Sequence, residues 1–203
     1  VGGTGLYFRA LTEGLVETPD IPGAIRAEVA ALAARGADLV AALAQEDPAA
    51  AGRLNRSDQP RLMRALEVVR ATGRPLSAWQ AEAQGAPLLA PGTWQGLFLN
   101  PGREALVRRI DRRFVTMMEA GALEEVAGLA RLSLPANRGI MKAHGVPHLM
   151  AHLAGDLGRE AAIALGQRDT RRYARRQITW ARKFMADWQW FDSAEAAAGR
   201  LAG

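Results

Sequence analysis

The chain has 203 residues, of which 49% are hydrophobic and 23% charged, so it is long enough to bury a core and is expected to be globular. It has no cysteine, which excludes disulfides and thiolate chemistry, and no charge-free apolar run of the ~18 residues that a membrane span needs, so we expect a soluble cytoplasmic protein. The net charge is +5, and arginine supplies all but two of the 26 basic residues, a skew that either a nucleic-acid partner or a GC-rich coding bias would produce.

The chain opens on a glycine turn. The run from Val1 to Gly5 is typical of a buried strand that passes directly into a helix, with Thr4 as the helix N-cap and an end near Gly14. Because a strand end is an unusual start, we expect the chain to be the carboxy-terminal part of a longer protein. The turn offers backbone N–H groups and a positive helix end to an anion, but such turns also merely connect a strand to a helix.

A helical region follows the turn. Residues 24–74 are rich in Ala and Leu and predict several short helices, with Arg61 and Arg64 on the exposed face of the last one. The loop at 85–92 contains two prolines, and the segment 94–99 is the best remaining strand. We therefore expect the chain to return to a central sheet at this strand.

Helices are predicted for most of the remainder. Apolar residues at helical spacing indicate one over 103–119, and a shorter helix follows from Leu123. Two more are expected over 147–153 and 159–188. The second half of the chain is therefore predicted to be mainly helical.

The terminal helix has the densest charge in the sequence. Seven basic side chains lie between Arg168 and Lys183. Tyr173 and Trp188 are the ends of an aromatic stripe at helical spacing, which fits packing against a core better than a platform for bases. The charged face is either solvated or bound to a polyanion such as RNA.

A second basic cluster lies on the predicted helix 103–119. Arg108, Arg109, Arg112 and Arg113 flank its apolar stripe. Guanidinium groups pair with phosphate oxygens through two donors, so this cluster either neutralises a diphosphate or forms a solvated face.

Three histidines are spaced by four residues. His144, His148 and His152 would align on one helix face, but Gly145 and Pro147 interrupt the register. We therefore expect surface histidines at these positions and no metal site.

Four short motifs follow one another along the chain. They are Val-Gly-Gly-Thr-Gly-Leu-Tyr-Phe at 1–8, Arg-Leu-Met-Arg-Ala-Leu-Glu-Val at 61–68, Arg-Ile-Asp-Arg-Arg-Phe at 109–114 and Arg-Arg-Gln-Ile-Thr-Trp at 175–180. In this order they resemble the tRNA dimethylallyltransferase family, also known as the IPP transferase family, from its Gly-Gly-Thr turn onward. The resemblance covers essentially all 203 residues.

The resemblance implies an α/β fold with a P-loop NTPase-like core and a helical insertion subdomain. Residues 1–23 and 94–203 are then the carboxy-terminal part of the core, an incomplete parallel sheet that is mostly helical in this fragment. Residues 24–93 are the helical insertion and tRNA-contacting region. The family's phosphate-binding loop and general-base Asp precede Val1, so we expect this fragment to be inactive alone and the Mg²⁺ ligands to lie upstream, with no metal ligand within it.

The implied reaction is transfer of a dimethylallyl group from dimethylallyl diphosphate to N6 of the adenosine on the 3′ side of the anticodon in tRNA. The adenine must leave its stack, and the departing diphosphate gains negative charge that cations or N–H groups stabilise. The expected partner is the tRNA anticodon stem-loop, without a membrane, and the protein is expected to be a monomer. We also expect one continuous groove to join the terminal arginines to the glycine turn.

The resemblance implies particular site residues. Catalytic roles fall on Thr4, Arg109 and Arg113, and diphosphate binding falls on Gly2, Gly3 and Thr4. The tRNA-contacting positions are Arg26, Pro60, Arg61, Leu62, Met63, Arg64, Lys142, Ala143, His144, Gly145, Arg175, Arg176, Gln177, Thr179, Trp180 and Arg182. The chain departs from the family at Pro60, where Gln is common, and at Val146, where Tyr is usual.

Two other functions fit the same sequence. An adenylate isopentenyltransferase would share the fold and the donor, but a free nucleotide has few phosphates to engage the basic terminal helix. A non-catalytic RNA-binding fragment would keep the surface without the chemistry. An upstream Gly-rich loop ending in Gly-Lys-Ser or Gly-Lys-Thr, followed by Asp-Ser, would favour the enzyme.

Overall fold

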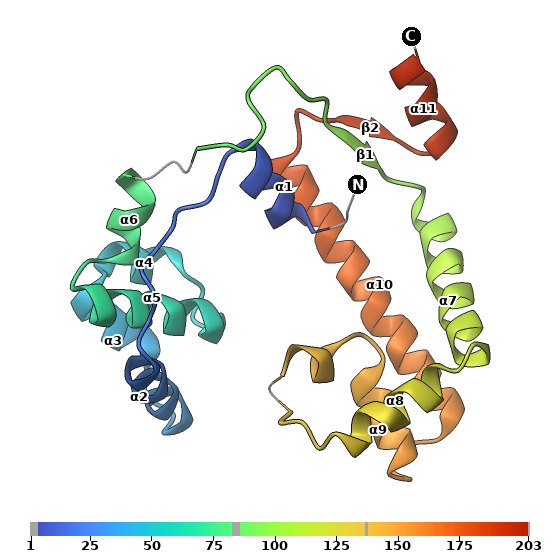
Figure 1. Cartoon of the computed structure of the whole chain (residues 1–203), viewed down its shortest axis with the longest axis horizontal. Helices are drawn as coiled ribbons and strands as arrows, with labels where there is room; N and C mark the ends of the chain where they lie inside the picture. The colour runs from blue at the N-terminus through green and yellow to red at the C-terminus, as the bar shows by residue number, and fades with distance from the viewer. Residues whose placement is uncertain (1–3, 83–85, 137, 203) are drawn as a thin grey trace. The chain divides into compact units, whose positions relative to one another are not determined.

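A computed structural model of the chain describes residues 4–82, 86–136 and 138–202, which fall into two compact units (Figure 1). The helical unit comprises Leu6–Trp94, and the sheet unit comprises Val1–Gly5 and Gln95–Gly203. Each unit has its own cluster of buried apolar side chains. The assignment of residues 24–93 to an insertion and of the rest to a catalytic core stays a prediction.

The described part of the helical unit is built from short helices. They are α1 (Gly5–Thr12), which begins in the sheet unit, α2 (Gly23–Ala34), α3 (Leu39–Glu46), α4 (Pro48–Arg53), α5 (Gln59–Thr72) and α6 (Leu76–Glu82). Local residues set their ends: Asp38 accepts hydrogen bonds from the backbone of the first turn of α3, and Gly73 ends α5 in the left-handed conformation at φ 69°.

The core of the helical unit joins α2, α3 and α5. Val29, Leu43 and Leu66 are fully buried there. The carboxylate of Asp47 is buried as well, and it accepts hydrogen bonds from the backbone N–H of Ala50 and from both the N–H and the hydroxyl of Ser77. Asp47 therefore both caps α4 and ties it to the start of α6.

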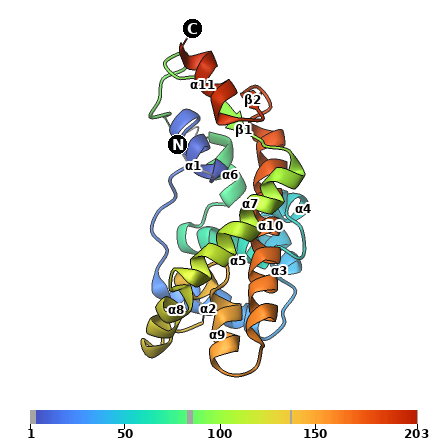
Figure 2. The same cartoon turned by 90° about the vertical axis from the view of Figure 1, so that its right-hand side faces the viewer.

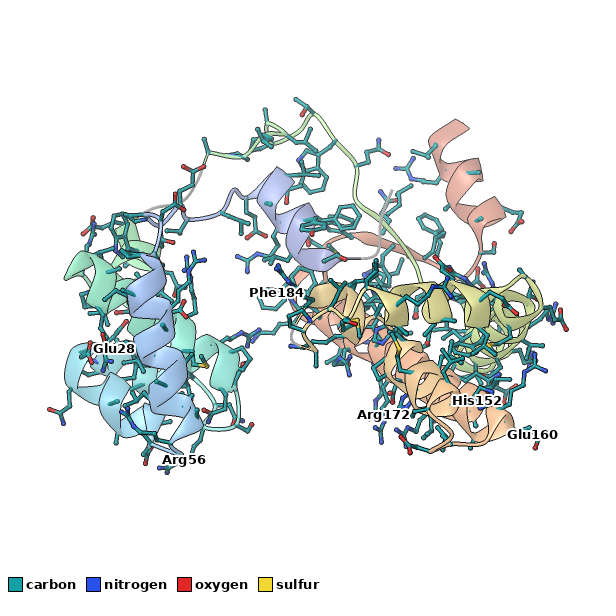
Figure 3. The ribbon with its side chains drawn as sticks, turned by 60° about the horizontal axis from the view of Figure 1, so that its bottom comes forward. Glu28, Arg56, His152, Glu160, Arg172 and Phe184 are labelled. Atoms are coloured by element: carbon teal, nitrogen blue, oxygen red, sulfur yellow. The ribbon has the colours of Figure 1, made fainter. Side chains whose placement is uncertain are left out.

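Charged groups reinforce the same three helices. The guanidinium of Arg70 on α5 donates to Glu46 on α3 and to Glu28 on α2, and Figure 3 labels Glu28 on α2. The side-chain hydrogen bond with Glu46 raises the pKa of Arg70, an effect that burial opposes. Arg70 therefore links α5 to α2 and α3 through ion pairs.

The described part of the sheet unit combines two strands with helices. Its elements are β1 (Leu97–Leu99), α7 (Arg103–Glu119), α8 (Ala122–Arg131), the 3₁₀ helix η1 (Gly139–Lys142), α9 (Val146–Leu153), α10 (Arg159–Phe184), β2 (Gln189–Phe191) and α11 (Ala194–Ala202). The strands are parallel, with Phe98 opposite Trp190, and their ring centroids are 4.3 Å apart. Figure 1 shows the strands side by side, with α7 leaving β1 and α10 leading to β2.

The predicted elements differ from the structure both in the middle of the chain and near its carboxy terminus. The helix predicted over 159–188 ends at Phe184, and the strand β2, the helix α6 and the helix α11 were not predicted. The strand predicted over 94–99 is confined to Leu97–Leu99. Pairing with β1 explains the missed strand, because three residues acquire β geometry only from a partner far away in the sequence.

Phe114 occupies the centre of the sheet unit. Its ring lies where a Cβ atom on Gly166 of α10 would overlap it, and 3.0 Å from where a Cβ on Gly145 would stand. Met118 and Leu149 complete this core with Ala162 of α10. Glycine is therefore required at two places for α7, α9 and α10 to pack closely, and Figure 2 shows α7 crossing α10.

Candidate nucleic-acid and anion interface

A groove of about 720 Å³ lies between α7 and α10. Its apolar lining includes Leu106, Ile110 and Ile178. Its basic lining is a set of arginines, which we call the arginine groove: Arg103, Arg168, Arg171, Arg172, Arg175 and Arg182. No Asp or Glu is among the residues that line it, so the site suits an anion that can also cover apolar surface.

The arginines at one end of the groove are partly neutralised. Arg171 pairs with Asp111 of α7, and Asp169 lies 3.3 Å from Arg168 and 3.9 Å from Arg172. These ion pairs leave less uncompensated positive charge at this end of the groove. Figure 3 labels Arg172 on α10 between Glu160 and Phe184.

The other end of the groove holds uncompensated charge. Within residues 4–82, 86–136 and 138–202, no carboxylate pairs with Arg103, Arg175 or Arg182. Arg103 is the first residue of α7, whose N-cap Gly102 supplies no side-chain hydrogen bond. The positive end of α7 therefore adds to these three guanidinium groups.

The opposite face of α10 carries the aromatic stripe. Trp180 and Phe184 have ring centroids 4.7 Å apart, and Trp180 is so close to Gly5 that a Cβ on Gly5 would overlap its indole. Gly5 directly follows Thr4, which is exposed. Gly5 therefore lies against α10 at Trp180.

This contact corrects the expectation of a single groove. Arg175 lines the arginine groove, whereas Trp180 does not. Five residues of α-helix turn the side-chain direction by about 140°, so Arg175 and Trp180 point to different sides of α10. The groove arginines and the surface that contacts Gly5 therefore lie on different sides of the same helix, α10.

The three histidines have separate partners. His148 Nε2 lies 2.8 Å from Asp169, and His152 Nδ1 lies 2.8 Å from the carbonyl of Leu157. The ring of His144 packs against Tyr173. Among the residues that the structure describes, no group of three His, Cys, Asp or Glu side chains could hold a metal ion, so no described residue is assigned to Mg²⁺.

Asp169 links α9 to α10. The hydrogen bond with His148 lowers the pKa of the Asp169 carboxyl, Arg168 lowers it further, and partial burial opposes both. The carboxylate of Asp169, on α10, is therefore held in its charged form by His148 of α9 and by its neighbour Arg168.

The implied catalytic residues lie apart from the arginine groove. Arg109 and Arg113 are exposed on α7, one helical turn apart, and neither lines the groove. Thr4 is exposed beside the contact between Gly5 and Trp180. Gly2 and Gly3 lie outside the described residues. Their chemical roles stay predictions.

The tRNA-contacting positions of the helical unit differ in exposure. Arg26 and Arg61 are exposed, and Arg61 pairs with Asp58 at 3.0 Å. Arg64 donates to the hydroxyl of Thr18 at 2.8 Å. Leu62, by contrast, is fully buried in the core, so its side chain packs inside the unit and does not contact a ligand.

The remaining positions of that stretch begin α5. Pro60 stands in the first turn of the helix, where the missing N–H is not needed. Gln59 donates its side-chain amide to the carbonyl of Arg56 at 3.0 Å. Met63 is half-buried against the core. The side-chain amide of Gln59, the residue before Pro60, is therefore already hydrogen-bonded within the loop.

Of the groove arginines, Arg103 was not predicted, and Arg168, Arg171 and Arg172 were noted only as part of the basic helix and not as site residues. Arg103, Arg168, Arg171 and Arg172 line the groove with the predicted Arg175 and Arg182. The spacing of 168, 171, 172 and 175 places all four on one face of a helix, and this signal was present in the sequence. The sequence does not indicate that α7 forms the opposite wall of the groove.

The geometry defines an α/β protein in which a long basic helix lines an anion groove with one face and contacts Gly5 with another. The pattern of the IPP transferase family matches residues 1–184. The chain is 52% identical to a tRNA dimethylallyltransferase of Methylobacterium nodulans over all of its own length and 68% of the relative's. It is 54% identical to one of Azorhizobium caulinodans, over 93% of the chain and 61% of the relative.

Solved structures agree with this assignment. A full-length tRNA isopentenylpyrophosphate transferase from Bacillus halodurans superposes with a TM-score of 0.57 at 27% identity, over 98% of the chain and 62% of that protein. A eukaryotic dimethylallyltransferase acting on tRNA gives 0.70 at 25% identity, over 89% of the chain and 46% of that protein. The mostly helical fold with a small parallel sheet matches these structures, as the α/β prediction requires.

The chain belongs to the IPP transferase family. It spans between 61% and 68% of the length of the two curated relatives named above. None of the described helices has the length and apolar character of a membrane span.

Proposed function

We propose that the protein transfers a dimethylallyl group from dimethylallyl diphosphate to N6 of the adenosine next to the anticodon of tRNA, on its 3′ side. The observation that carries the proposal is the arginine groove, found in a chain of this family. Six guanidinium groups line it, three of them without a carboxylate partner among the described residues, which matches a substrate with many phosphates. A relative about half identical to the chain is named tRNA dimethylallyltransferase.

The two faces of α10 support two different binding roles. The arginine groove holds phosphates of the RNA backbone, because three of its guanidinium groups have no carboxylate partner in the described part of the chain. The opposite face, where Gly5 meets Trp180, holds the adenine beside Thr4. RNA is thereby bound by one helix through two chemically different faces.

The proposed chemistry forms one bond and breaks another. N6 of the adenine attacks the allylic carbon, the C–O bond to diphosphate breaks, and diphosphate leaves with the bonding electrons while N6 loses a proton. Arg109 and Arg113 are proposed to stabilise the leaving charge, and Thr4 to position the amine. Both arginines are exposed and accessible to an anion.

The proposal includes Mg²⁺, the anticodon stem-loop as the bound part of tRNA, and a monomeric cytoplasmic enzyme. Mg²⁺ supplies charge neutralisation to the diphosphate when bound. The described side chains offer no ligand set for it, so no step is assigned to the metal here.

The whole gene product should be incubated with Mg²⁺, dimethylallyl diphosphate and unmodified tRNA, and the digested nucleosides should then be weighed. A nucleoside heavier by one dimethylallyl group, dependent on the donor, is the expected result. A parallel reaction with free AMP separates tRNA modification from nucleotide prenylation. Binding of tRNA without any product would support an RNA-binding protein instead.

A further inference from the structure

Asp111 of α7 is held by two side chains of α10. The guanidinium of Arg171 donates to its carboxylate, and the side-chain amide of Gln167 donates to its backbone carbonyl at 3.0 Å. Gln167 and Arg171 are four residues apart, so they lie one turn apart on the same face of α10. All three residues are half-buried. We call them the clamp, because two donors from one helix converge on one residue of the other.

The clamp acts on α7 differently from the apolar contact beside it. Phe114, three residues after Asp111, packs on Gly166 of α10, and this contact sets how closely the two helices approach. Burial of apolar surface is not directional, so it constrains the rotation of α7 about its own axis only weakly. A hydrogen bond weakens steeply as its angle becomes bent. The two polar contacts with Asp111 therefore set the rotation of α7.

The rotation of α7 decides where two other side chains point. Each residue advances an α-helix by about 100°, so Arg109 and Arg113, two positions before and after Asp111, both point ~160° away from it. Both are exposed, and neither lines the arginine groove. In the part of the chain that the structure describes, no carboxylate pairs with either of them. The direction of both guanidinium groups therefore follows the helix that carries them.

A small rotation of α7 is enough to misplace these groups. An atom ~6 Å from the axis of a helix moves by about 2 Å when the helix turns by ~20° about that axis. A reacting group that is misplaced by ~1 Å can cost about 100-fold in rate. The clamp can therefore place a catalytic charge without touching the substrate itself.

We propose that Gln167 and Arg171 are positioning residues of the transfer reaction. Acting through Asp111, they hold α7 in the rotation at which its two outward arginines face the departing diphosphate. The inference rests on the proposed function, in which Arg109 and Arg113 stabilise the leaving charge. Gln167 distinguishes this role from mere charge compensation, because it is neutral, does not line the arginine groove and bonds to the backbone of α7.

The test measures the single-turnover rate of dimethylallyl transfer by the whole gene product, at saturating tRNA and donor, together with the Kd for tRNA. Gln167→Met keeps the length of the side chain and removes the donor. We expect it to lower the rate by roughly 5- to 50-fold and to leave the Kd unchanged. Gln167→Lys keeps a donor of similar reach and should recover part of the rate. Gln45→Met, at an exposed position of α3, is the matched control and should change neither value.

A second background separates positioning from folding. In a protein that carries both Arg109→Ala and Arg113→Ala, Gln167→Met should slow transfer by less than about 2-fold, because the groups that it places are gone. A loss of the same size in both backgrounds would show that Gln167 acts through the fold as a whole, and would overturn the inference.

Asp111→Asn guards against misfolding of Gln167→Met. It keeps the shape of the side chain but weakens the bond from Arg171, so transfer should slow by about 2- to 10-fold. Binding of tRNA should be at least as tight as in the wild type, because Arg171 then brings an unpaired charge to the groove. Normal transfer rates for Gln167→Met and Asp111→Asn would overturn the inference. A normal rate for the protein without Arg109 and Arg113 would instead overturn the role that the proposed function gives to these arginines.

Discussion

Gly5 lies so close to the indole of Trp180 that a Cβ atom on Gly5 would overlap the ring. This contact connects the start of α1 to the long basic helix α10 and sets where the preceding Thr4 lies. A side chain at position 5 would force the turn or the ring to shift.

Gly5→Ala should therefore lower the rate of dimethylallyl transfer by about 10- to 100-fold, because small displacements of a positioned group are costly in catalysis. Trp180→Leu combined with Gly5→Ala makes room and should recover part of the loss. Gly23→Ala is the matched control, since nothing lies within 4 Å of a Cβ placed there. Initial rates with tRNA and donor in excess would decide, and a Gly5→Ala protein of normal rate would contradict the contact.

Gly166→Ala should destabilise the protein by about 1 to 3 kcal/mol, because the new methyl group meets the ring of Phe114. Phe114→Leu in the same chain should cost less than the two changes added together, since both act on one contact. The measurement is urea unfolding. Gly199→Ala on α11 has open space around it and should be neutral or stabilising by up to ~1 kcal/mol.

Arg175→Ala should weaken tRNA binding by about 1 to 3 kcal/mol, because Arg175 lines the arginine groove without a carboxylate partner among the described residues. It should also reduce the slope of log K against log salt by roughly 0.7 to 0.9 for one phosphate contact. Arg131→Ala, an exposed arginine at the end of α8, is the control and should change neither. An identical slope for both variants would remove Arg175 from the binding surface.

The pKa of Asp169 is lowered, first by its hydrogen bond with His148. Its interactions therefore stabilise the fold above the ordinary carboxyl pKa of 3.8, and this stability is lost as the pH falls through the lowered value. Asp169→Asn should have a lower melting temperature than wild type at pH 7, and the difference should shrink towards pH 3. Asp156→Asn, at an exposed turn, is the control for the loss of one negative charge. A difference that does not change with pH would argue against the ion pair.

Asp47→Ala should cost about 2 to 4 kcal/mol of stability, because it removes a helix cap and leaves the buried donors of Ala50 and Ser77 without an acceptor. The hydrogen bonds from Ser77 and Ala50 lower the pKa of Asp47 against the opposing and largest effect, burial. Lowering the pH should therefore reduce the free energy of unfolding of the wild type more than that of Asp47→Ala. Asp38→Ala, an exposed cap, should cost about 1 kcal/mol in the same urea titration.

Local chemistry made much of the secondary structure predictable. The break before Pro48 and the end of α5 at Gly73 are visible in the sequence, and α7 occupies the predicted residues 103–119. These ends depend on caps and on residues with restricted φ, which act within a few positions. The basic character of α10 and the family of the chain were readable for the same reason: each resides in short, contiguous motifs.

The sequence by itself thus determined most of the helices, the family and the basic character of α10. Only the tertiary structure decided that α7 faces Arg175 across a groove, that Trp180 meets Gly5 on the other side of the helix, and that Leu62 is buried. It also decided that the chain leaves α10 at Phe184 to pair with β1. Such outcomes depend on contacts between residues far apart in the chain, and no local propensity specifies which surface of a helix its distant partners will cover.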